Sequence, residues 1–254
     1  MADEVQVEVD GAVAVITVNR PQAKNAINAA VAKGVAAALD ELEARKDVSV
    51  YVLTGAGGTF CSGMDLKAFL NGEVPSVEGR GFGGLVEQPP AKPIIAAVEG
   101  YALAGGFELA LACDIVVASR EAKFGLPEPK RGLIAAAGGL LRLPRRIPYH
   151  IAMEVALTGD FYSAERFYEL GLVNRLTEPG EALAAAKELA GKIAANAPLS
   201  LVSTKQVIVE SADWTREEMF KKQSAIMNKV FTSKDAMEGA AAFAEKRAPK
   251  WSGE

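Results

Sequence analysis

The stretch Glu99-Gly100-Tyr101-Ala102-Leu103-Ala104-Gly105-Gly106-Phe107-Glu108 decides how this chain is interpreted. It follows an apolar segment, 94–98, that predicts a buried strand, and it leads through two glycines into an apolar helix over 107–112. A tight turn that opens a helix directs free backbone N–H groups at one point in space. Glu108 lies three residues beyond Gly105, so both are expected on one face of the first helical turn.

Length and composition indicate a globular protein with a large core. The chain has 254 residues, half of them apolar, and a mean hydropathy of +0.12, enough for one large domain or a domain with a smaller appendage. A net charge of −4 and a pI of about 5.3 argue against nucleic-acid binding, which favours a basic face. The acidic N-terminus does not resemble a signal peptide, and no apolar run reaches the roughly 18 residues of a membrane span. We therefore expect a soluble, cytoplasmic protein without membrane contact.

The scarcity of histidine and cysteine removes several mechanisms. The only histidine, His150, cannot build a His-rich metal site, and it stands at an expected helix start, where a surface or capping role is predicted. Cys61 and Cys113 show no metal-ligand spacing and fit a reducing compartment, so both are interpreted as small buried residues.

The N-terminal half alternates strands and helices. Residues 5–9 and 12–18 predict a hairpin, residues 28–44 a helix capped by Asn28, and residues 48–53 a strand that completes a βαβ crossover. The glycine- and proline-rich stretch 71–90 has no clean period and predicts a mobile loop or lid, with a linker between domains as the alternative.

After a third crossover strand at 114–118 and a short strand at 122–124, the chain becomes mostly helical. Only 173–176 still predicts a strand. Helices are expected over 138–143, 149–158, 163–170, 181–196, 198–210, 215–230 and 233–245. The apolar stripes of the last three helices suit an ordinary core or packing on another subunit.

Two small-residue turns predict an oxyanion hole. Ser62-Gly63-Met64-Asp65 leads from one strand into a helix, and the turn at Gly105 repeats this arrangement one unit later. In a parallel sheet the ends of neighbouring strands lie side by side, so the N–H groups of Met64 and Gly105 could converge. One such donor is worth roughly 3 kcal/mol of stabilisation to an enolate oxygen. Ordinary turn-to-helix junctions would also need small residues, so spacing alone leaves this open.

Glu108 and Glu128 favour catalysis. Glu108 lies in an apolar helix, where an unused carboxylate is costly, and Glu128 stands between two prolines that stiffen its backbone. Paired carboxylates beside an oxyanion hole suit the addition or removal of water at a C=C bond conjugated to a carbonyl. We expect the helix N-terminus to keep Glu108 ionised as the base, and a drier loop to raise the pKa of Glu128 so that it acts as the acid.

The chain resembles the enoyl-CoA hydratase (crotonase) family over nearly its whole length. The motifs that carry the resemblance are Asn19-Arg20-Pro21 with Asn25-Ala26, Phe60 to Leu66, Gly100 to Leu109, Phe124 to Glu128 and Ala242 to Trp251. The resemblance implies an α/β fold, the crotonase-like ββα spiral, in residues 1–195, with a C-terminal helical trimerisation region in 196–254. It also implies a homotrimer or a dimer of trimers, acyl-CoA thioester substrates, and no metal or redox cofactor, since coenzyme A is part of the substrate.

The same resemblance assigns roles to individual residues. The oxyanion donors fall on Met64 and Gly105, and the two catalytic glutamates fall on Glu108 and Glu128. The coenzyme A contacts fall on Lys24, Ala26, Ser62, Met64, Asp65, Leu66, Lys67 and Gly105. Three features depart from the family pattern: Ser62-Gly63 replaces Ala-Gly, Ala104 replaces the first glycine of a triplet, and 133–139 lacks a proline found in many relatives.

The preferred prediction is a hydro-lyase that hydrates trans-2-enoyl-CoA. A carnitinyl-CoA dehydratase is an alternative, because it would use the same glutamates on a cationic acyl group, with Glu73, Glu78 or Phe82 as candidate walls. A double-bond isomerase needs one carboxylate, so two count against it. A non-catalytic acyl-CoA binder is the alternative outside enzymes. Lys246 and Lys250 are further candidates for holding coenzyme A phosphates, and a solvated surface role would suit Lys24 and both of these equally.

Overall fold

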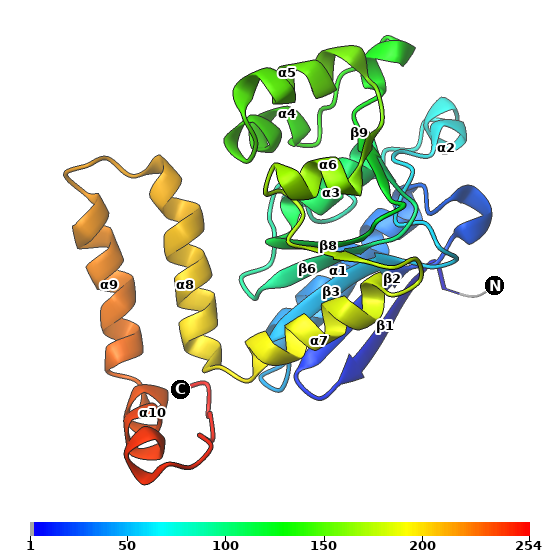
Figure 1. Ribbon diagram of the computed structural model, residues 1–254. Helices are drawn as coiled ribbons and strands as arrows, with labels where there is room; N and C mark the ends of the chain where they lie inside the picture. Colours follow the sequence, from blue (N-terminus) through cyan, green and yellow to red (C-terminus); the bar gives the residue numbers. More distant parts are fainter. Residues whose placement is uncertain (1–2) are drawn as a thin grey trace.

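A six-stranded sheet forms the centre of the molecule, whose residues 3–254 are described by the computed structural model (Figure 1). Its strands lie in the order β1 (Val5–Asp10), β2 (Val13–Val18), β3 (Val50–Gly55), β6 (Ile94–Val98), β8 (Ile115–Ser119) and β11 (Arg175–Thr177). The hairpin β1–β2 is antiparallel, and every later pair is parallel. The predicted hairpin and crossovers are confirmed, as is the mixed α/β class.

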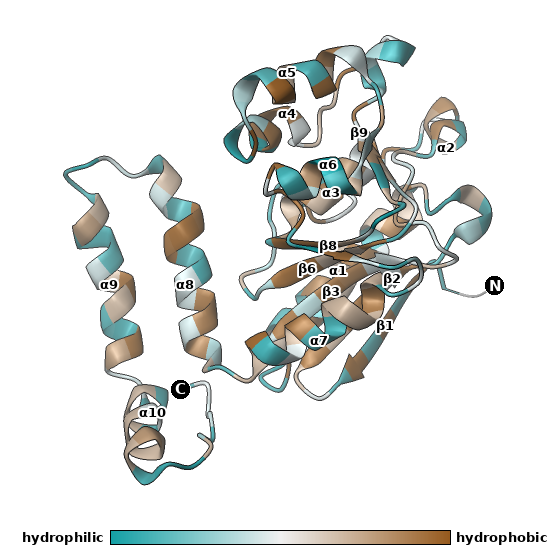
Figure 2. Cartoon of the chain, in the orientation of Figure 1, coloured by the Kyte–Doolittle hydropathy of each residue, from teal (hydrophilic) through white to brown (hydrophobic). Residues whose placement is uncertain are grey.

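Each face of the sheet carries its own apolar layer, because side chains alternate along a strand. Helix α7 (Ala182–Ala194) covers one face with Ala186 and Ala190 against strand valines such as Val52. The other face holds the larger core, to which α1 (Ala29–Ala44) and α3 (Gly105–Ala112) contribute. Figure 2 shows the sheet strands as the most continuous apolar ribbon. Asn28 caps α1 as predicted, accepting a hydrogen bond from the Val31 N–H.

A second, three-stranded sheet is the main feature that the sequence interpretation missed. It consists of β7 (Tyr101–Leu103), β9 (Lys123–Gly125) and β10 (Tyr162–Ser163). The turn at Gly105 therefore follows β7 and not the strand at 94–98. All four residues before Gly105 are apolar, but β7 is too short for its alternation to show in the sequence.

A hairpin occupies the stretch predicted as a mobile loop. Short helix α2 (Leu66–Leu70) precedes β4 (Ser76–Val77), which pairs antiparallel with β5 (Gly81–Phe82). The hairpin packs on α1: a Cβ at Gly84 would lie 2.2 Å from the Ala32 carbonyl oxygen. The linker alternative is wrong, because the strands on either side of this stretch, β3 and β6, are neighbours in one sheet.

Helices dominate after β9, close to the predicted limits. They are η2 (Glu128–Arg131), α4 (Gly139–Arg142), η3 (Leu143–Arg145), α5 (Tyr149–Thr158), α6 (Ala164–Glu169), α7, α8 (Pro198–Glu210), η4 (Ser211–Asp213), α9 (Met219–Phe231) and α10 (Lys234–Glu245). His150 is exposed on α5 and both cysteines are buried, as predicted. None of the helices within 3–254 is both long and apolar enough to cross a bilayer.

Helices α8 to α10 stand beside the main body (Figure 1). Lys205 of α8 ties them to it, since its Nζ lies 2.6 Å from an Asp114 carboxylate oxygen. Their apolar side chains do not all enter this chain's core: Phe220, Phe231 and Phe243 are 71–88% exposed. The interpretation of these stripes as ordinary core is therefore wrong for these three residues. The division of the chain at 195/196 stays a prediction; α7 ends at Ala194 and α8 begins at Pro198.

We predict that Phe167→Ala lowers the free energy of unfolding by about 3–5 kcal/mol, because this buried ring packs on Phe107 and Phe124 at centroid distances of 5.2 and 5.5 Å. Urea unfolding measures the change. Tyr168→Ala on the same helix is the control, since Tyr168 is 50% exposed and its loss should cost about 0.5 kcal/mol or less. Equal losses in both variants would contradict a core role for Phe167.

Candidate active site

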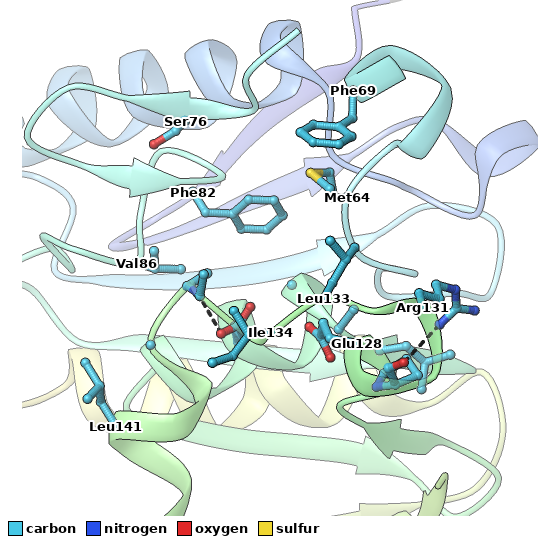
Figure 3. A pocket seen from close by; sticks show the side chains of 18 of the residues that line it. Met64, Phe69, Ser76, Phe82, Val86, Glu128, Arg131, Leu133, Ile134 and Leu141 are labelled. Atoms are coloured by element: carbon cyan, nitrogen blue, oxygen red, sulfur yellow. Dashed lines mark hydrogen bonds between the residues drawn. The ribbon is translucent and has the colours of Figure 1, made fainter. Parts of the chain in front are cut away.

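One large cavity, of about 1200 Å³, lies between the β4–β5 hairpin and the segment after β9. Figure 3 shows Met64, Phe69 and Phe82 on one side of it and Glu128, Leu133 and Ile134 on the other. Both turns singled out in the sequence contribute, through Ser62 and Met64 and through Leu103 to Gly105. Both glutamates line it as well. The cavity therefore gathers the residues predicted to carry the chemistry.

The two turns touch each other. Cys61 is bridged to Ala102 of β7, and Met64 is bridged to Ile27. A Cβ at Gly63 would lie 2.8 Å from the Ala104 Cβ and 3.4 Å from the Gly105 nitrogen. Among the hydrogen bonds within residues 3–254, none is donated by the N–H of Met64 or of Gly105. The structure thus places these two free donors in adjacent turns that both line the cavity.

Backbone strain accompanies this contact. Ala104 has φ +53° and ψ −129°, a conformation that glycine adopts more readily. The Ala104 N–H donates to the Gly125 carbonyl of β9 at 2.9 Å, so the second sheet holds the turn in place. Gly106 packs flat on the other turn, where a Cβ would lie 2.2 Å from the Cys61 carbonyl oxygen. Strained backbone that neighbouring structure enforces is typical of functional sites.

Glu108 is almost fully buried, with 2% of its surface exposed. Its Oε1 accepts hydrogen bonds from the N–H groups of Ala137 and Gly139, each at 2.8 Å. Burial is the largest influence and raises the pKa of Glu108 to about 7; the negative charge of Glu128 raises it further, while the two N–H donors and Arg142 oppose the rise. Burial therefore outweighs the help that the N-terminus of α3 is expected to give to the ionised form.

Glu128 begins η2 and is 8% exposed. Its Oε2 is buried and has no hydrogen-bond partner within residues 3–254. Burial raises the pKa of Glu128, with Arg131 partly opposing it, which is the direction predicted. Two buried carboxylates with raised pKa values thus share one cavity, an arrangement typical of acid–base catalysis.

The predicted coenzyme A contacts fall into two groups. Ser62, Met64, Leu66 and Gly105 line the cavity, whereas Lys24, Ala26, Asp65 and Lys67 do not. Lys24 places its Nζ 5.3 Å from the centre of the Tyr101 ring. Asp65 caps α2 and forms an ion pair of 3.0 Å with Arg20, so its side chain has a structural partner. Glu73 and Glu78 also lie outside the cavity; Phe82 is the one wall candidate that lines it.

Sequence interpretation missed most of the apolar lining. The unforeseen residues are Phe69, Val86, Leu133, Ile134, Leu141 and the charged Arg142. Leu133, Ile134 and Leu141 are exposed in this chain despite being large and apolar. The one available signal was the run Leu133-Ile134 beside Glu128, because exposed aliphatic pairs often mark a binding surface.

We predict that Glu108→Gln stabilises the fold at neutral and alkaline pH. A carboxyl whose pKa is raised by folding holds its proton in the native state between its ordinary pKa and about 7, so stability falls as pH rises through that window. Glutamine can still accept the two N–H hydrogen bonds. Urea unfolding should show a gain of up to about 3 kcal/mol at pH 8 that shrinks toward zero near pH 4. A gain that does not vary with pH would contradict the raised pKa.

Comparison with known proteins agrees with this geometry. A protein-family model described as enoyl-CoA hydratase/isomerase matches residues 8–254. A solved enoyl-CoA hydratase from Mycobacterium tuberculosis H37Rv is 61% identical, with a TM-score of 0.98 over 99% of this chain and 100% of that one. A solved carnitinyl-CoA hydratase from Mycobacterium avium is 42% identical, with a TM-score of 0.79 over 100% of both chains. A curated carnitinyl-CoA dehydratase from Proteus mirabilis (strain HI4320) is 39% identical over 100% of both chains. The expected crotonase fold is thus confirmed, and the chain belongs to the enoyl-CoA hydratase/isomerase family.

Proposed function

We propose that this enzyme adds water reversibly across the 2,3 double bond of an enoyl-CoA thioester with an apolar acyl group. The observation that carries the proposal is the shared cavity of Glu108 and Glu128, two buried carboxylates beside the free N–H groups of Met64 and Gly105. The N–H donors can stabilise an enolate oxygen. Hydration also needs one carboxylate to take a proton from water and a second to supply a proton to carbon.

The proposed reaction assigns one task to each group. The thioester oxygen accepts hydrogen bonds from Met64 and Gly105, which stabilise the negative charge that develops when oxygen adds at C3. Ionised Glu108 takes a proton from the attacking water, and neutral Glu128 gives a proton to C2. Two N–H donors on Glu108 support its ionised form, and the unpartnered Oε2 of Glu128 supports the neutral form.

The lining of the cavity supports an apolar acyl group. Phe69, Phe82, Leu133, Ile134 and Leu141 contribute to it, and chain burial against such side chains is favourable. Among the described residues, three arginines line the cavity, namely Arg131, Arg142 and Arg145, and Glu87 is the only acid besides the reacting pair. A quaternary ammonium group could contact the rings of Phe69 and Phe82, but it would meet the repulsion of the three arginines.

A carnitinyl-CoA dehydratase is the second candidate, favoured by the names of relatives at 39–42% identity over the full chain. It would use the same carboxylates and the same N–H groups. An isomerase needs one carboxylate and a pure binder needs none, so the burial of both glutamates in one cavity supports neither.

Assembly of the expected homotrimer, or dimer of trimers, is part of the proposal. The exposed rings of Phe220, Phe231 and Phe243 on α9 and α10 support it, because single chains seldom leave such side chains in water.

We predict that the protein removes the enoyl-thioester absorbance of crotonyl-CoA and longer apolar homologues. The value of kcat/KM for the best of these should exceed that for crotonobetainyl-CoA by at least about tenfold, because the three arginines of the cavity repel a cation. A preference for crotonobetainyl-CoA would favour the dehydratase. Tight thioester binding without turnover at any chain length would identify a binder.

We predict that Glu108→Gln and Glu128→Gln each lower kcat for hydration by about 100- to 10,000-fold, because each removes one proton transfer. Affinity for the 3-hydroxyacyl-CoA product, measured by calorimetry, should change much less. Glu78→Gln is the control, since Glu78 is exposed and outside the cavity. Near-full activity in both cavity variants would refute the assigned roles.

A further inference from the structure

Arg142 of α4 spans the space between two walls of the cavity. Its Nη2 donates a hydrogen bond of 2.5 Å to the carbonyl oxygen of Val86, which lies just after the β4–β5 hairpin. Figure 3 shows Val86 on the hairpin side and Leu141, the neighbour of Arg142, on the α4 side. Arg142 is half-buried and lines the cavity, so its charge is held close to the reacting groups.

The other edge of the same guanidinium lies on the turn that holds Glu108. A Cβ at Gly138 would come within 2.1 Å of Arg142 Nη1, so a side chain at 138 would collide with it. Gly138 stands between Ala137 and Gly139, the two residues whose N–H groups donate to Glu108. Its φ of +94° is one that glycine adopts readily, and it presents both donors to a single carboxylate oxygen.

The charged groups around Glu108 are few. Glu128 on η2 is the negative neighbour that disfavours its ionised form, and Arg142 is the positive neighbour that favours it. The other charged side chains that line the cavity are Glu87, Arg131 and Arg145. Arg142 is thus the cation that opposes the combined effect of burial and of Glu128.

We propose that Arg142 is a positioning residue for Glu108, tying the turn at 137–139 that holds this carboxylate to the Val86 carbonyl just after the β4–β5 hairpin. The catalytic part of the inference rests on the proposed function, in which Glu108 takes the proton from water. The positional part does not, because it concerns the turn and the ionisation of Glu108 alone.

The experiment compares Arg142→Met, Arg142→Lys and a matched control, Arg146→Met. Arg146 is one turn further along, donates to the Cys113 carbonyl at 3.3 Å and does not line the cavity. Infrared difference spectroscopy across pH follows the protonated carboxyl band of Glu108, which is assigned by its loss in Glu108→Gln. The pH profile of hydration is measured on the same samples, and thermal unfolding confirms that each variant is folded.

In Arg142→Met the pKa of Glu108 should rise by about one unit or more, because an opposing cation is removed. The acidic limb of kcat/KM then moves to higher pH by the same amount, since ionised Glu108 is the base. At pH values above the acidic limbs of both the variant and the unmodified enzyme, kcat of the variant should still be about 10- to 100-fold lower, because the turn at 137–139 is no longer held. Arg142→Lys should return the pKa of Glu108 most of the way to its original value but restore little of kcat. Lysine keeps the positive charge, but it cannot contact the Val86 carbonyl and the turn at Gly138 at the same time.

Unchanged Glu108 titration in folded Arg142→Met, or the same shift in Arg146→Met, would overturn the inference. If Arg142→Met does not fold, Arg142→Lys decides: full activity with native stability overturns it, and a loss of kcat at a native pH profile supports it. Absence of hydration in the unmodified enzyme would refute the proposed function, while the infrared titration would still test the position of Arg142.

Discussion

The close approach of two backbone turns is the constraint on which the rest of this structure depends. Gly63 and Gly106 lie where any Cβ would collide with the opposite turn, at 2.8 and 2.2 Å respectively. Turns that fit this tightly can be kept only by structure on both sides. The bridge from Cys61 to Ala102 and the hydrogen bond from Ala104 to Gly125 supply it. The small second sheet therefore holds the turns together, because its strand β7 leads into the Gly105 turn and its strand β9 accepts the hydrogen bond from Ala104.

Burial of two carboxylates lowers the stability of the fold. A raised pKa for Glu108 means that its ionised form is less stable in the folded chain than in water, so the fold loses stability as that proton leaves. The extensive core on both faces of the six-stranded sheet offsets this loss. Hydrogen bonds from Ala137 and Gly139 reduce the loss of stability that ionisation of Glu108 causes, and they also fix where the carboxylate lies. Stability and geometry are thus set by the same contacts.

Sequence patterns predicted the parts of the fold that repeat and missed those that do not. Helices 29–44 and 198–210 were predicted to within a residue because their start signals are clear: Asn28 caps the first, and Pro198 opens the second. Strand β7 was missed because three residues cannot show a period. Met64, Gly105 and the two glutamates were found from motifs, whereas Arg142 was not. Its partner Val86 is distant in the sequence, and its neighbour Gly138 has no side chain, so no local sequence pattern reveals either contact.

The same division separates reaction from substrate. The N–H donors are placed by the close backbone contacts of Gly63 and Gly106, and Glu108 is held by two backbone N–H groups, so relatives with the same sheets can share them. The apolar wall of the cavity is formed by side chains of the β4–β5 hairpin and of residues 131–142, such as Phe82, Ile134 and Leu141. These side chains lie outside the strands of both larger sheets, so substitutions there can leave the sheets intact. Relatives named for enoyl-CoA and for carnitinyl-CoA chemistry both align with this chain over its whole length. Preference among acyl groups therefore has to be argued from the cavity wall, where Phe82 lies over Gly105 so closely that a Cβ there would come within 2.5 Å of its ring. Phe82 thus puts an apolar ring directly beside that turn, so a change at this residue would alter the cavity wall while the backbone contacts between the two turns remain.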